Sequence, residues 1–135
     1  MIIEIQEPET ITEVNISEET KTELKNLFFE EGQVIVHCLF PAMREEFLIR
    51  IWQTTFLIDK NSSHKSKLLH AEGITLFPYW TPVEPNHSKK FTLFFSRLPS
   101  SCTTFDLLEE IPEHGGFFVK GIPRNSPDVY NVNLH

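Results

Sequence analysis

Apolar and polar residues alternate with a period of two along most of this 135-residue chain. Phe91, Leu93 and Phe95 fall on one parity, with Thr92 and Phe94 on the other. Side chains two apart in a strand point to the same face, so such a run predicts a strand with one face in a core. Strands are predicted at residues 34–40, 47–52, 55–58, 67–71, 74–77, 91–95, 104–108 and 117–120. The first of these runs is apolar at nearly every position, as in a central strand of a sandwich.

Turn-forming residues separate these runs. The cluster at residues 59–63 (Asp-Lys-Asn-Ser-Ser) predicts a hairpin between the strands on either side of it. Pro41, Pro99 and the pair Gly115-Gly116 interrupt the chain elsewhere. Many short strands with regular turn signals are typical of a sandwich or a barrel, so the predicted class is all-β.

The first 30 residues are ambiguous. Short alternating pieces at 2–5 and 11–16 are consistent with strands. Residues 17–29 fit one short helix capped by Ser17, with Leu24 and Leu27 on one face, and they fit a strand equally well. Both alternatives stay open.

The length of the chain fits one domain, predicted to span residues 1–135. Hydrophobic residues make up 40% and charged residues 23%, which is ordinary for a globular domain, and 12 Phe predict an aromatic core. The segment 123–135 is polar and is expected to be a loosely attached C-terminal tail.

The net charge of −7 argues against nucleic acid or an anionic membrane as a partner, because those surfaces bind clusters of Lys and Arg. No stretch has the roughly 18 apolar residues of a membrane span. The N-terminus lacks the features of a signal peptide, so the chain as written is expected to be cytoplasmic. An exported protein whose signal had been trimmed would look the same.

Three segments resemble a family of uncharacterised bacterial β-sandwich modules with the pattern KLL-AEGI followed by FTL-F--LP----FDL-E. The matching segments here are KLLHAEGI at 67–74, FTLFFSRLP at 91–99 and FDLLE at 105–109. The resemblance covers residues 47–122. It implies an immunoglobulin-like antiparallel β-sandwich of about seven or eight strands, and it brings no catalytic residues.

Cys38, Trp52 and Cys102 have a spacing that suits an immunoglobulin-type disulfide packed on a Trp. However, Cys102 follows a Leu-Pro-Ser-Ser stretch that predicts a loop, and an unexported chain would lie in a reducing compartment. We therefore expect Cys38 to be a buried free thiol. Neighbours in a strand point to opposite faces, so His37 cannot activate Cys38.

We expect no catalytic residues, no metal site and no cofactor. The six His show no His-x-His, His-x-x-x-His or Cys-x-x-Cys spacing. Glycine-rich phosphate loops and the Gly-x-Ser-x-Gly motif are absent from the sequence. The prediction is that the chain is not an enzyme.

The candidate binding residues are Phe77, Tyr79 and Trp80, in a proline-flanked loop at 77–82. Proline-fixed aromatic side chains lose little entropy on contact with a partner. The competing interpretation is that Phe77 and Trp80 plug one open end of the fold. The predicted function is a non-catalytic interaction or accessory module that binds a protein partner or a second copy. The alternative is a small-ligand binder that stacks sugar rings on Tyr79 and Trp80.

Overall fold

The structure is a computed structural model that describes residues 2–4 and 33–134. This part of the chain is all-β, as predicted, and holds no helix long and apolar enough to cross a membrane. Its strands are β1 (Ile2–Glu4), β2 (Val34–Phe40), β3 (Phe47–Arg50), β4 (Thr55–Asp59), β5 (Lys65–Glu72), β6 (Thr81–Val83), β7 (Lys89–Phe95), β8 (Thr104–Glu109), β9 (Phe118–Pro123) and β10 (Val129–Asn133).

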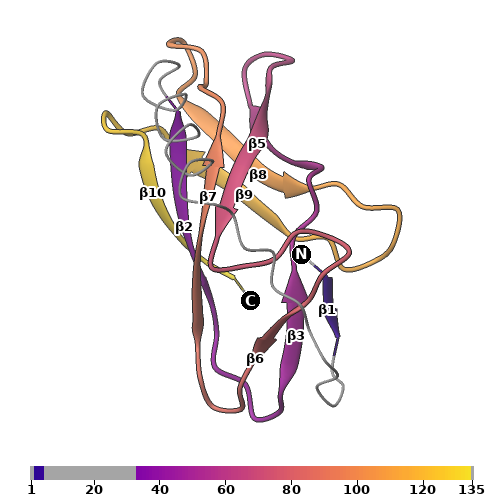
Figure 1. The fold of residues 1–135 in the computed structure, drawn as a ribbon. Coiled ribbons are helices and arrows are strands. Elements are labelled where there is room, and N and C mark those ends of the chain that lie inside the picture. The colour runs from indigo at the N-terminus through magenta and orange to yellow at the C-terminus, as the bar shows by residue number, and fades with distance from the viewer. Residues whose placement is uncertain (1, 5–32, 135) are drawn as a thin grey trace, which may run out of the picture.

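The strands form two sheets (Figure 1). A three-stranded sheet has the order β1-β3-β6, and a seven-stranded sheet has the order β10-β2-β7-β5-β4-β8-β9. All neighbours in the seven-stranded sheet are antiparallel except β10, which runs parallel to β2. The expected hairpin across residues 59–63 is confirmed as the β4–β5 pair.

The seven-stranded sheet curls until its two ends meet, which makes it nearly a barrel. Phe105 of β8 and Tyr130 of β10 are far apart in the strand order, yet their ring centroids are 4.9 Å apart. This contact requires a strongly coiled sheet, as the twist of β-strands allows. The all-β class is therefore confirmed, while the immunoglobulin-like arrangement stays a prediction.

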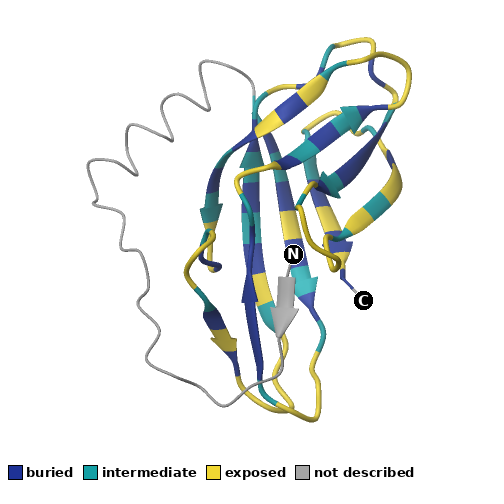
Figure 2. Cartoon of the chain, turned by 90° about the vertical axis from the view of Figure 1, so that its right-hand side faces the viewer, coloured by how far each residue is buried: buried dark blue, intermediate teal, exposed yellow. Residues whose placement is uncertain are grey.

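The core lies inside this curl and extends to the smaller sheet. Alternate residues of β2 and β7 point inward and are buried, as the dark blue bands in Figure 2 show. At the lower end of the molecule, the rings of Phe40 and Phe47 meet edge to face at 5.8 Å and join β2 to β3. The predicted aromatic core is confirmed, with Phe91, Phe95 and Phe105 buried in it.

The prediction of a loosely attached tail at 123–135 is wrong. Residues 129–133 form β10, and the backbone amide of Leu134 donates to Leu39 O at 2.9 Å. Tyr130, Val132 and Leu134 are buried, whereas Asn131 and Asn133 are exposed. The segment is polar on average but apolar at every second position. Its average composition therefore does not reveal the period of two that is typical of a strand.

An ion pair holds the approach to β10 in place. Arg124 donates to both carboxylate oxygens of Asp128, at 2.5 and 2.9 Å, and also to Pro99 O at 2.7 Å. The hydroxyl of Tyr130 donates to Asp128 Oδ1 and accepts the amide proton of Asn125. This bidentate pair raises the pKa of Arg124, and it fastens the start of β10 to the loop that precedes β8.

The structure differs from the expectation at residues 74–77. The strand expected at 74–77 is reduced to one parallel bridge between Leu76 and Ile51, because Pro78 cannot continue a ladder. The alternating piece expected at 2–5 is present as β1 over Ile2–Glu4. Residue 5, the piece at 11–16 and the helix or strand at 17–29 lie outside the described residues.

We predict that alkaline pH weakens the fold through Tyr130. Burial raises the pKa of this phenol from 10.0 to about 12. Between those values the folded chain retains a proton that the unfolded chain has lost, so rising pH favours unfolding. Urea titrations across this window should show a free energy of unfolding that falls less steeply for Tyr130→Phe than for the natural chain. Equal slopes would contradict the assignment.

Candidate functional site

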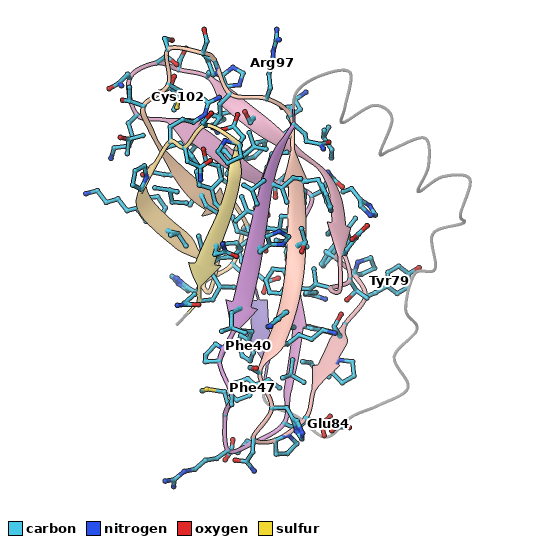
Figure 3. The ribbon with its side chains drawn as sticks, turned by 90° about the vertical axis from the view of Figure 1, so that its left-hand side faces the viewer. Phe40, Phe47, Tyr79, Glu84, Arg97 and Cys102 are labelled. Carbon is cyan, nitrogen blue, oxygen red and sulfur yellow. The ribbon has the colours of Figure 1, made fainter. Side chains whose placement is uncertain are left out.

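The three candidate residues lie in the connection from β5 to β6. Phe77 and Tyr79 are each 44% exposed, while Trp80 is half-buried. Figure 3 shows Tyr79 pointing outward from this connection on the right-hand side of the view, away from Cys102 near the upper end. Phe77 and Tyr79 are thus among the few large hydrophobic side chains that the described residues expose.

The guanidinium of Arg50 is surrounded by aromatic rings. Its carbon lies 3.8 Å from the centre of the Trp80 ring, 4.6 Å from that of Phe77 and 6.0 Å from that of Trp52. Trp52 and Phe77 in turn stack with their centroids 4.0 Å apart. We call these four residues the Arg50 cluster. It brings β3 and the β5–β6 connection into direct contact.

Arg50 is 8% exposed, so its charge is largely removed from water. A guanidinium stays protonated in proteins and must be compensated where it lies. The ring faces supply part of that compensation, since a desolvated cation–π contact is worth about 2 kcal/mol. Arg50 Nη1 also donates to Pro78 O at 3.2 Å. The cation therefore holds both the rings and the backbone of the loop.

Backbone and threonine hydrogen bonds fix the rest of the loop. Ile51 makes two backbone hydrogen bonds with the loop. Its amide donates to Thr75 O at 2.9 Å, and its carbonyl oxygen accepts a hydrogen bond from the amide of Phe77 at 2.8 Å. The Thr75 hydroxyl donates to Tyr79 O at 2.9 Å, and the Thr75 amide donates to Thr81 Oγ1 at 2.9 Å. The Phe77–Pro78 peptide bond is cis. These contacts hold the exposed rings on a rigid support.

The two interpretations of the loop thus apply to different residues. Trp80 packs on Arg50 and is half-buried, which fits a plug. Tyr79 has no ring contact within the described residues and points outward, which fits a contact surface. Phe77 combines both roles, because it stacks on Trp52 while part of its ring stays exposed.

Sequence reasoning missed Arg50 and Trp52 as parts of this site. A period of two in the strand predicted at 47–52 puts both on one face, together with Leu48. Trp52 does not pack on a disulfide, because both cysteines are free, as expected for Cys38. The sequence did carry a signal for a cation–π cluster: one face of the strand at 47–52 holds an Arg and a Trp, and the segment at 77–80 is rich in aromatic residues.

The two thiols are poorly suited to nucleophilic chemistry. Both are buried, and burial raises the pKa of Cys38 to about 12. Burial and the neighbouring carboxylate of Asp59 raise the pKa of Cys102. A thiol with a raised pKa stays protonated at neutral pH, and the protonated form is a weak nucleophile. Within residues 2–4 and 33–134, no group of three His, Cys, Asp or Glu side chains is placed to hold a metal ion.

Substitutions should separate the two parts of the loop. We expect Trp80→Ala to lower the free energy of unfolding by about 2–4 kcal/mol, because it removes the ring that packs on Arg50. Tyr79→Ala should change it by less than about 0.5 kcal/mol, because that ring is half-exposed. Chemical denaturation of both variants measures this difference. A fully stable Trp80→Ala variant would rule out the plug.

Comparison of the chain with family models, with curated proteins and with solved structures found no match. The resemblance to bacterial β-sandwich modules therefore stays a prediction.

Proposed function

We propose that this chain is a non-catalytic interaction module that binds a protein partner through Phe77 and Tyr79. The observation that supports this most is a pair of half-exposed aromatic rings on a loop that is fixed from behind by the Arg50 cluster. In this proposal the fold is an immunoglobulin-like module, and the loop is its contact surface.

Rigid aromatic side chains suit the centre of a protein interface. Binding orders side chains at a cost of about 0.5–1.5 kcal/mol for each flexible one. Tyr and Phe have two side-chain torsions, and here stacking restricts Phe77 before any partner arrives. The ordering cost of Phe77 is therefore largely met on folding, and burial of both rings on a partner would contribute directly to affinity.

The non-catalytic part of the proposal draws on the chemistry of the described residues. The cysteines are buried with raised pKa values, and the most conspicuous cation, Arg50, is committed to aromatic rings and a carbonyl. Neither arrangement offers a group poised for proton transfer or nucleophilic attack.

The alternative, a carbohydrate-binding module, has weaker support at this loop. A sugar stacks on the open face of an aromatic ring, and Arg50 already occupies one face of Trp80. The ring of Tyr79 is the better of the two platforms, because it is half-exposed and points outward.

Site-specific photo-crosslinking in the native cells tests the proposal. A benzoylphenylalanine at position 79 should yield one dominant protein adduct, whose mass tells a second copy of this chain from a different protein. The matched control carries the same group at position 118, because Phe118 is 52% exposed on β9 and lies outside the loop. Adducts of equal yield at the two positions, or none at position 79, would refute the proposal.

A further inference from the structure

A hollow of about 470 Å³ lies over β10, β2 and β7, three strands that run side by side (Figure 1). Three consecutive residues from each strand line it: 37–39, 90–92 and 131–133. The middle residue of each triplet is buried in the core, so its backbone forms the floor. The flanking side chains face outward and form the walls. A volume of this size suits a small molecule rather than a protein segment.

The strand register arranges these walls in two rows. Asn131, His37 and Thr92 are direct neighbours across the three strands, and so are Asn133, Leu39 and Lys90. Neighbouring strands are about 4.8 Å apart, so each row of three side chains spans roughly 10 Å. The rows combine two amides, an imidazole, a hydroxyl, an ammonium and one apolar side chain.

The charge of the hollow is opposite to that of the chain. The protein carries a net charge of −7, yet none of the residues that line the hollow is acidic, and Lys90 supplies a positive charge. Lys90 forms no ion pair with the described residues, so its ammonium is free to bind a ligand. A lone cation among amide groups favours an anion, and charge-assisted hydrogen bonds are the stronger kind.

One wall of the hollow is already oriented. The Nδ1 atom of His37 lies 2.8 Å from the Thr92 hydroxyl, which fixes the imidazole ring. This leaves Nε2 of an exposed ring for a further partner, and the amides of Asn131 and Asn133 can both donate and accept. Leu39 offers half-exposed apolar area against the carbon skeleton of a ligand.

We propose that this hollow binds a small polyhydroxylated anion, whose carboxylate or phosphate contacts Lys90 and whose hydroxyls contact Asn131, Asn133 and His37. The site lies on a different part of the molecule from the β5–β6 connection, and it does not depend on the function proposed for that connection. Probes that carry either a carboxylate or a phosphate show which of these two anionic groups the hollow prefers.

Nuclear magnetic resonance titration of the labelled full chain tests this site. The probes are glucuronate, glucose 6-phosphate and glucose, which share a ring and differ in the anionic group. We expect saturable chemical-shift changes in the amides of the three triplets with one or both anions. The dissociation constant for glucose should be at least about threefold larger than that for the preferred anion. Added salt should weaken the binding of the anions.

Lys90→Gln should weaken binding of the preferred anion by about three- to fivefold, and Asn131→Ala should weaken it as well. Lys67→Gln is the matched control, since Lys67 is also an exposed strand lysine but lies on β5 outside the hollow. The proposal is overturned if neither anion shifts these amides, if glucose binds as tightly as the anions, or if the two lysine variants behave alike.

Discussion

The burial of one permanent positive charge, on Arg50, governs the shape of the proposed contact loop. The strand pattern brings this residue to a face of β3 that is covered, leaving its side chain 8% exposed. A cation in that position needs ring faces and carbonyl oxygens, and the β5–β6 connection provides Trp80, Phe77 and Pro78 O. These contacts fix the backbone around Tyr79, whose own ring is 44% exposed.

A second constraint is the closure of the large sheet. β10 lies parallel to β2 and brings Tyr130 against Phe105 of β8, so the two ends of the strand order share one core. The Arg124–Asp128 pair fixes the turn that allows this return. The pairing of β10 with β2 also places Asn131 and Asn133 on the same outer face of the sheet as His37 and Lys90. The polar hollow is therefore a consequence of the C-terminal strand.

The sequence allowed most of the strands and the inward parity of β7 to be predicted, because a buried face imposes a period of two over several residues. It also allowed the free thiol of Cys38 to be predicted. The strand at 129–133 was missed, since alternating Asn residues make its composition polar. The Arg50 cluster was missed as well, because an Arg and a Trp on one strand face do not show which loop covers them. Trp52 and Phe77 are 25 positions apart, and their stacking depends on how β3 pairs and on how the loop crosses it.

Hydrogen exchange of an Arg50→Ala variant tests most directly whether this cation organises the loop. The account predicts that the amides of Thr75, Phe77 and Tyr79 lose their protection while those of β2 and β7 keep it, because the loop loses its anchor and the core does not. Arg50→Lys, which retains a charge but not the planar group, should give an intermediate loss. Unchanged protection of the three loop amides in the alanine variant would contradict the account.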